Sequence, residues 1–145
     1  MSIIEFNEGD RLQSQIADIG WYSARITEME TKASKQQTSI NYWTTFTIDG
    51  PKFRGKEIKI CYNSASNGSS ILGSLHMVPH SDILKVFAAV QNVPLKDVNL
   101  QVDTDTLMDK PIDIKLDTAM GDGRPMNILV DYLPAGKGTG AKPSY

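Results

Sequence analysis

The chain has 145 residues, with 40% hydrophobic and 22% charged residues, values that fit one ordinary globular domain. Its one cysteine, Cys61, excludes an internal disulfide and suits a reducing compartment. The first residues do not follow the pattern of a secretory signal, and no apolar stretch is long enough to cross a bilayer. We therefore expect neither a secreted disulfide scaffold nor a membrane protein.

The net charge of −2 hides an uneven distribution along the chain. Residues 20–62 carry seven basic and four acidic side chains, so this segment has a net charge of +3 and the remainder −5. The same segment holds seven of the eleven aromatic residues. The overall acidity disfavours a protein that coats nucleic acid through phosphate contacts alone. The local concentration of cations and rings favours a site for single strands, whose bases stack on aromatic side chains.

The N-terminal half of the chain predicts an arm followed by three strands. Residues 1–19 contain spaced apolar positions and are expected to pack on the domain as an arm. Alternating apolar and polar residues predict strands at 21–29, 40–48 and 56–62. A polar loop separates the first two strands, and the turn sequence Asp49-Gly50-Pro51 follows the second.

The C-terminal half predicts a helix, two more strands and a tail. A loop of small polar residues covers 63–70, and a helix begins with Ser81 as its cap and ends before Val93-Pro94. Alternation returns at 111–118 and 126–133 on either side of a turn. Residues 135–145 are rich in glycine and proline and predict a flexible, disordered tail.

The order of these elements predicts a mainly β fold. Three strands, a helix and two strands match a five-stranded, partly open barrel of the oligonucleotide-binding (OB) type, with one helix between strands 3 and 4. The predicted domains are an N-terminal arm at 1–19, an OB-type domain at 20–134 and a flexible tail at 135–145. A split sheet of another α+β type stays open, because the sequence does not fix the order of strands.

Several motifs in this order resemble a family of bacteriophage single-stranded-DNA-binding proteins of OB type. They are GWYSARITEMETKASK, FTIDGPKFRGKEI, AAVQNVP, MDKPIDIKL and NILVDYLPAG, and they span Gly20 to Gly136. The resemblance implies binding of single-stranded DNA during phage replication or recombination in the host cytoplasm, with phage replication or recombination proteins as further partners. A homo-oligomer is also compatible with it. The tail has no acidic residue, unlike the acidic tails through which many such proteins recruit partners.

Strand alternation selects candidate residues for the DNA interface. If Ile26, Phe46 and Ile60 face the core, then Arg25, Trp43 and Lys59 face outward on three successive strands, with the indole as a stacking platform between two cations. Neighbouring loops and strand ends complete the predicted DNA-binding set, which is Trp21, Arg25, Lys32, Lys35, Trp43, Lys52, Phe53, Arg54, Lys56, Lys59 and Arg124. Structural roles compete with this interpretation: either tryptophan could be buried, Trp43 under the arm and Trp21 in the core.

Signatures of an enzyme are weak. His76 and His80 are separated by a proline and lack an HExxH pattern, and Asp103 and Asp105 lack the further ligands of a calcium loop. We therefore expect no metal, no cofactor and no catalysis. A protein-interaction module on the same fold, as an accessory subunit, host-factor inhibitor or virion component, is the alternative that the overall acidity favours. A small nuclease is a third hypothesis, which the missing metal cluster disfavours.

Overall fold

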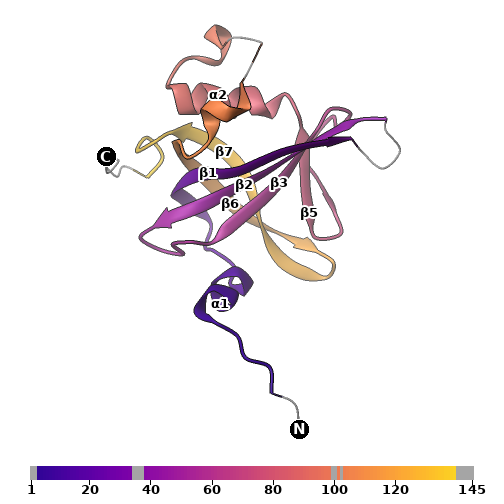
Figure 1. Cartoon of the computed structure of the whole chain (residues 1–145), viewed down its shortest axis with the longest axis vertical. Helices are drawn as coiled ribbons and strands as arrows, with labels where there is room; N and C mark the ends of the chain where they lie inside the picture. Colours follow the sequence, from indigo (N-terminus) through magenta and orange to yellow (C-terminus); the bar gives the residue numbers. More distant parts are fainter. Residues whose placement is uncertain (1–2, 34–37, 99–100, 102, 140–145) are drawn as a thin grey trace.

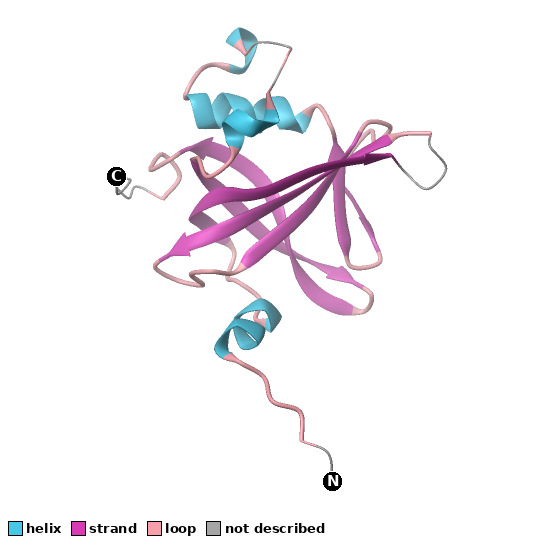
Figure 2. Cartoon of the chain, in the orientation of Figure 1, coloured by secondary structure: helices cyan, strands magenta, loops and turns pink. Residues whose placement is uncertain are grey.

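The computed structural model describes residues 3–33, 38–98, 101 and 103–139. One strongly curved sheet of seven strands forms a half-barrel, in the order β4-β5-β3-β2-β1-β6-β7 (Figure 1). Helix α2 (Asp82–Gln91) covers one end of it, and helix α1 (Glu8–Ser14) lies at the opposite end (Figure 2). The strands are β1 (Gly20–Ala33), β2 (Ile40–Gly50), β3 (Glu57–Asn63), β4 (Ser70–Leu72), β5 (Leu75–Pro79), β6 (Pro111–Gly121) and β7 (Arg124–Pro134). Two single turns of 3₁₀ helix follow α2, η1 (Leu95–Asp97) and η2 (Thr104–Leu107).

The mainly β class is confirmed, but the predicted count of five strands is wrong. The additional strands β4 and β5 form a short antiparallel hairpin, and β5 runs parallel to β3 with His76 opposite Ile60. With three and five residues, they are too short to give a clear alternating pattern. The helix therefore follows the fifth strand of the sheet, although it still lies between the third and fourth of the long strands.

The long strands form as their alternating residues predict. Ile26, Phe46 and Ile60 are each fully buried, so the predicted inward faces of β1, β2 and β3 are confirmed. Helix α2 closes the core with Ile83, Val86 and Ala89. It follows Ser81, the predicted cap, but the serine side chain forms no capping hydrogen bond. The helix ends at Asn92, which takes a left-handed conformation there.

Side chains close the half-barrel where backbone pairing does not. The hydroxyl groups of Tyr62 on β3 and Tyr132 on β7 lie 2.6 Å apart, and the Tyr132 ring packs 6.1 Å from that of Phe46 on β2. Near the turn between β6 and β7, Gly121 lies against the backbone of Gly73. A Cβ atom added to Gly121 would lie 2.7 Å from the carbonyl oxygen of Gly73. The β6–β7 hairpin thus touches the tip of the β4–β5 hairpin.

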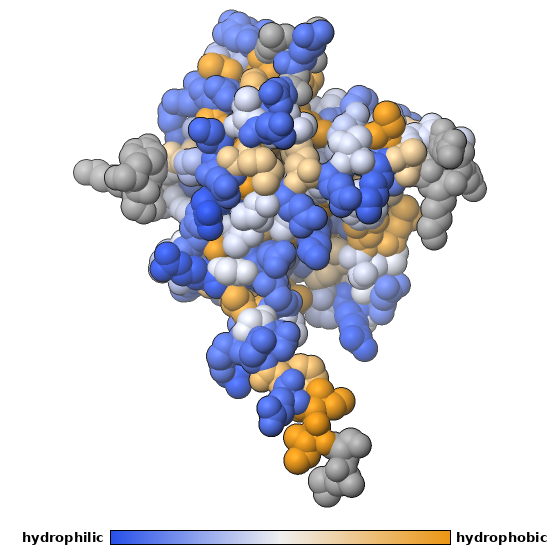
Figure 3. Space-filling view, in the orientation of Figure 1, coloured by the Kyte–Doolittle hydropathy of each residue, from blue (hydrophilic) through white to orange (hydrophobic). Residues whose placement is uncertain are grey.

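The N-terminal arm contains a helix that the sequence analysis did not predict. Asn7 and Asp10 begin α1 with a reciprocal capping box, with backbone–side chain distances of 2.8 and 2.9 Å. No residue of α1 is buried. The arm packs on the domain through Gln13 and Ala17, but its first apolar residues, Ile3, Ile4 and Phe6, are 75–81% exposed. Figure 3 shows them as an apolar group that projects beyond α1.

The first residues of the predicted tail pack on the domain. Residues 135–139 form turns, and Gly138 and Thr139 donate hydrogen bonds to the carboxylate of Asp113 on β6. A single sequence does not reveal this contact, because Asp113 precedes Gly138 by 25 residues. The rest of the predicted tail, 140–145, lies outside the described residues.

The burial of His76 predicts a loss of stability in mild acid. The imidazole is 1% exposed, its Nε2 lies 2.8 Å from Ser69 Oγ, and its Nδ1 has no partner among the described residues. Burial lowers its pKa from the ordinary value, against a smaller opposing effect of Asp82. The unfolded chain therefore takes up a proton at a higher pH than the folded chain. Stability should fall as the pH drops below about 6.5, by up to about 1.4 kcal/mol per unit.

Urea unfolding at pH 7.5, 6.0 and 5.0 measures this dependence. His76→Gln should flatten the decline, because the unfolded chain then has no imidazole to protonate at that position. His80→Gln is the matched control, since His80 is exposed and is the other histidine of the chain. A decline that is equally steep in wild type and His76→Gln would contradict the assignment.

Candidate nucleic-acid interface

The outer face of β1, β2 and β3 brings Trp43 and Lys59 to the same surface, as predicted. Trp43 lies opposite Glu30 on β1 and Cys61 on β3, and the next outward row pairs Thr45 with Glu28 and Lys59. The indole is half-buried, whereas Cys61 and Thr45 beside it are buried. Trp43 therefore keeps part of its ring accessible, and no residue of the arm lines the hollow around it.

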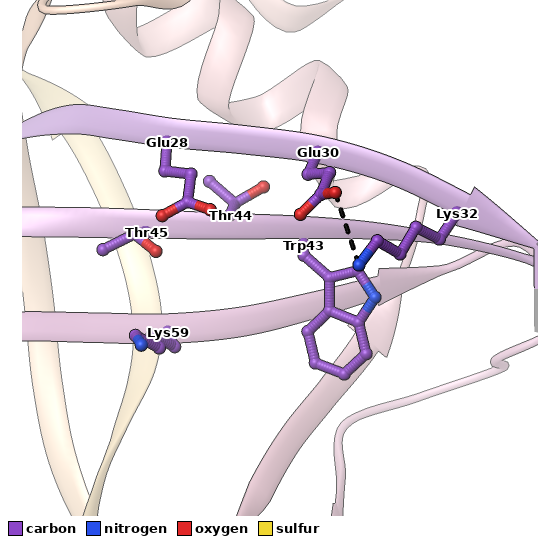
Figure 4. Close-up of a pocket in the computed structure, with 7 residues that line it drawn as sticks. All are labelled: Glu28, Glu30, Lys32, Trp43, Thr44, Thr45 and Lys59. Carbon is purple, nitrogen blue, oxygen red and sulfur yellow. Dashed lines mark ion pairs between the residues drawn. The ribbon is translucent and has the colours of Figure 1, made fainter.

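A shallow hollow of about 230 Å³ lies around the indole (Figure 4). Glu28 and Glu30 project into it from β1, with Lys32 at the end of that strand and Lys59 on β3. The Lys32 Nζ lies 3.3 Å from Glu30 Oε1, so one of the two ammonium groups is already paired with a carboxylate. Two acidic and two basic residues leave the rim with no net charge. The predicted concentration of positive charge is therefore not found around Trp43.

A β-bulge in β1 explains why the sequence did not predict that Glu28 and Glu30 face the hollow. The register of β1 against β2 shifts between Ile26 and Glu28. Thr27 is the extra residue at this shift, and it reverses the alternation that follows. Glu28, Glu30 and Lys32 therefore face outward, and Met29 packs against the core. Sequence alternation had no signal for the shift.

Arg25 does not flank Trp43, which corrects the predicted platform between two cations. Arg25 lies opposite Thr47, four residues and about 13 Å along β2 from the tryptophan. Its Nε donates to Asp49 Oδ1 at 2.8 Å, and its Nη1 lies 3.7 Å from Asp109 Oδ1. The hydrogen bond to Asp49 raises the pKa of the guanidinium further above its usual value. The side chain is thus committed to a structural ion pair.

Two further candidates, Lys56 and Phe53, have structural roles. Lys56 is 5% exposed, and its Nζ donates to the carbonyl oxygen of Gln13 at 3.0 Å. Burial lowers the pKa of this ammonium. The ring of Phe53 packs edge-on against that of Tyr22, with centroids 6.2 Å apart. Neither side chain is placed to contact a ligand on the outer face.

Three remaining candidates, Lys52, Arg54 and Arg124, do not line the hollow around Trp43. Lys52 and Arg54 are exposed in the β2–β3 loop, and Arg124 is exposed at the tip of the β6–β7 hairpin. A hollow of about 350 Å³ joins Lys59 to Pro125 and Met126, next to that tip. Within the described part of the chain, no ion pair forms at Lys52, Arg54, Lys59 or Arg124. Lys35 lies outside the described residues.

Trp21 occupies a separate place on the outer face. It is half-buried, lies opposite Lys115 on β6, and lines a cavity of about 480 Å³ with Lys52 on its rim. Glu30, the partner of Trp43, lies nine positions further along β1, on the order of 30 Å of extended strand. Trp21 and Trp43 therefore belong to two separate surface sites on the same sheet.

The described residues contain no group of three or more histidine, cysteine, aspartate or glutamate side chains able to hold a metal ion. Among the same residues, no helix combines the length and the apolar character that a bilayer span requires. No protein-family model matches the chain, and no curated protein matches its sequence.

Proposed function

We propose that the protein is an OB-type barrel that binds single-stranded DNA without marked sequence preference. The fold supports the OB assignment through its five long strands, which pair in the order β3-β2-β1-β6-β7 with a helix between the third and the fourth. The contact between the hydroxyl groups of Tyr62 and Tyr132 joins β3 to β7, the two edges of this five-stranded set. In this interpretation the β4–β5 hairpin is an insertion before the helix.

The observation that carries the proposal is the position of Trp43. The second and third strands of OB barrels form the surface on which oligonucleotides lie, flanked by two loops. Trp43 on β2 and Lys59 on β3 share this surface, Lys32 stands before the β1–β2 loop, and Arg124 stands in the β6–β7 turn. A base would stack on the accessible part of the indole, while the lysines would contact flanking phosphates.

The residues of the hollow favour a mode of binding in which stacking outweighs charge. Glu28 and Glu30 offset Lys32 and Lys59, and Arg25 and Lys56 are committed elsewhere. A large electrostatic contribution needs many phosphate contacts. We therefore expect the affinity for single-stranded DNA to fall only slightly with rising salt, in contrast to the steep fall of a protein with a basic channel. A role in phage replication or recombination in the host cytoplasm rests on the sequence resemblance.

Titration with a dT oligomer at several salt concentrations tests the proposed function. Tryptophan fluorescence should be quenched, and two phosphate contacts should give a slope of log K against log salt of about −1.4. Matched dA and dC oligomers should bind comparably, because every base offers a face for stacking. Unchanged fluorescence at low salt would refute DNA binding. A slope of about −5 would indicate a different, more basic surface.

A protein-interaction module is the second candidate, and the exposed arm favours it. Ile3, Ile4 and Phe6 present large apolar side chains to solvent within four residues. Contiguous apolar surface of this kind is typical of an interaction site. The triple variant Ile3→Ser, Ile4→Ser, Phe6→Ser should leave the affinity for dT unchanged if the DNA interface is the hollow at Trp43. It should abolish complexes with a protein partner if the arm is the functional surface.

A further inference from the structure

The last described residues, 136–139, form a strap across the outer face of β1 and β6, here called the C-terminal strap. The carboxylate oxygen Oδ2 of Asp113 accepts three hydrogen bonds from it. They come from the backbone N–H of Gly138 at 2.9 Å, the backbone N–H of Thr139 at 2.8 Å and the Thr139 hydroxyl at 3.0 Å. Charge-assisted bonds of this kind are stronger than neutral ones. The strap is therefore held at a defined position.

That position covers part of the Trp21 indole. A Cβ added to Gly138 would lie 2.4 Å from Cε3 and 2.6 Å from Cδ2 of the ring, closer than any side chain tolerates. Only glycine lets the backbone approach the six-membered ring so closely. The strap thus occupies apolar indole surface that would otherwise be accessible to a flat ring.

The cavity beside this contact has the chemistry of a nucleotide site. Its lining includes the Trp21 indole and one cation, Lys52, and the Asp113 carboxylate lies beneath the strap residues Gly138 and Thr139. Lys115, opposite Trp21 on β6, adds a second cation next to the indole. The hollow at Trp43 has two carboxylates instead. When Asp113 is counted with Lys52 and Lys115, the surroundings of Trp21 carry a net charge of +1, against zero in the hollow at Trp43, so a base with its phosphate is better matched in charge at Trp21.

We propose that Trp21 is a second base-stacking subsite for single-stranded DNA and that the C-terminal strap competes with the DNA for it. The inference rests on the proposed function and extends it from one stacking residue to two. A strand bound at Trp43 and continuing along β1 would displace the strap to reach Trp21. The closed strap lowers the apparent affinity by the fraction of molecules in which the indole is covered.

The strap is fastened in a way that permits release. Asp113 is fully buried, yet its Oδ1 has no hydrogen-bond partner among the described residues. A buried carboxylate oxygen without a partner carries a desolvation penalty. Opening of the strap would hydrate this oxygen, which offsets part of the cost of breaking the three hydrogen bonds.

The test compares Gly138→Ala with Gly68→Ala. The first adds a methyl group where the ring leaves no space, and the second adds one where nothing lies within 4 Å. Asp113→Asn is a second way to loosen the strap, since it removes the negative charge and keeps the shape. Anisotropy of a labelled dT oligomer measures affinity. Acrylamide quenching in a Trp43→Phe background, where Trp21 is the remaining tryptophan, measures strap opening without DNA.

Gly138→Ala and Asp113→Asn should increase quenching of Trp21, and each should tighten binding of dT about tenfold if the strap covers the indole in nine molecules of ten. Gly68→Ala should change neither quantity. Increased quenching with unchanged or weaker binding would overturn the inference while leaving DNA binding at Trp43 intact. Unchanged quenching in both loosened variants would overturn it as well. An absence of dT binding in every variant and in wild type would refute the proposed function itself, and the subsite with it.

Discussion

Replacement of Tyr132 by alanine is expected to lower the free energy of unfolding by about 3–5 kcal/mol, the range for removal of a large aromatic side chain from a core. The ring packs against Phe46 on β2, and its hydroxyl lies 2.6 Å from that of Tyr62 on β3. It therefore fills the space in which β7 approaches β3 without backbone pairing. Its loss should open the half-barrel along this line. Urea unfolding, followed by tryptophan fluorescence, measures the change.

Tyr132→Phe separates the hydroxyl from the ring. It keeps the packing but leaves the Tyr62 hydroxyl, which is fully buried, without its partner. The expected loss is about 1–3 kcal/mol, the penalty for a buried polar group left unsatisfied. Tyr42→Phe is the matched control, because the Tyr42 hydroxyl forms no hydrogen bond among the described residues. Equal stability of Tyr132→Phe and wild type would mean that the two hydroxyl groups do not join β3 to β7.

Trp43→Ala is expected to weaken binding of dT by about 5- to 150-fold, since stacking of one base contributes about 1–3 kcal/mol. The loss should be the same for dA and dC oligomers. Trp43→Phe should retain most of the affinity because a smaller ring still offers a stacking face. Titration of a labelled oligomer by anisotropy measures both variants without relying on tryptophan fluorescence.

Unfolding experiments serve as the control for the Trp43 variants. The indole is half-buried over Thr45 and Cys61, so its removal also exposes part of the sheet. A weakened affinity counts only if the variant is folded at the temperature of the titration. If folded Trp43→Ala binds as tightly as wild type, the hollow on β1–β3 is not the DNA interface, and the charge distribution around Trp21 becomes the better guide.

The long strands were predictable because their alternation extends over many residues. Ile26, Phe46 and Ile60 were expected in the core and are fully buried there. The same regularity placed Trp43 and Lys59 on one outer face. A period of two residues is a strong signal wherever one face of a sheet is buried and the other is not.

The failures arise where distant parts of the chain act on one another. The bulge after Ile26 turns Glu28 and Glu30 toward the hollow, although an unbroken alternation would turn them away. Asp49, 24 positions along the sequence, accepts a hydrogen bond from Arg25 and so partly neutralises its charge at the surface. Such effects depend on register and packing, which composition and periodicity do not encode.

The contact between Lys56 and the arm has a consequence for shortened versions of the chain. The ammonium group is almost completely shielded from water, and the Gln13 carbonyl that accepts from it belongs to a segment 43 positions earlier. Cleavage or truncation after Gln13 or Ser14 would remove that acceptor and leave the cation to find a new one or to lose its proton. The segment around Gln13 therefore contributes to the stability of the domain, although no residue of α1 is buried.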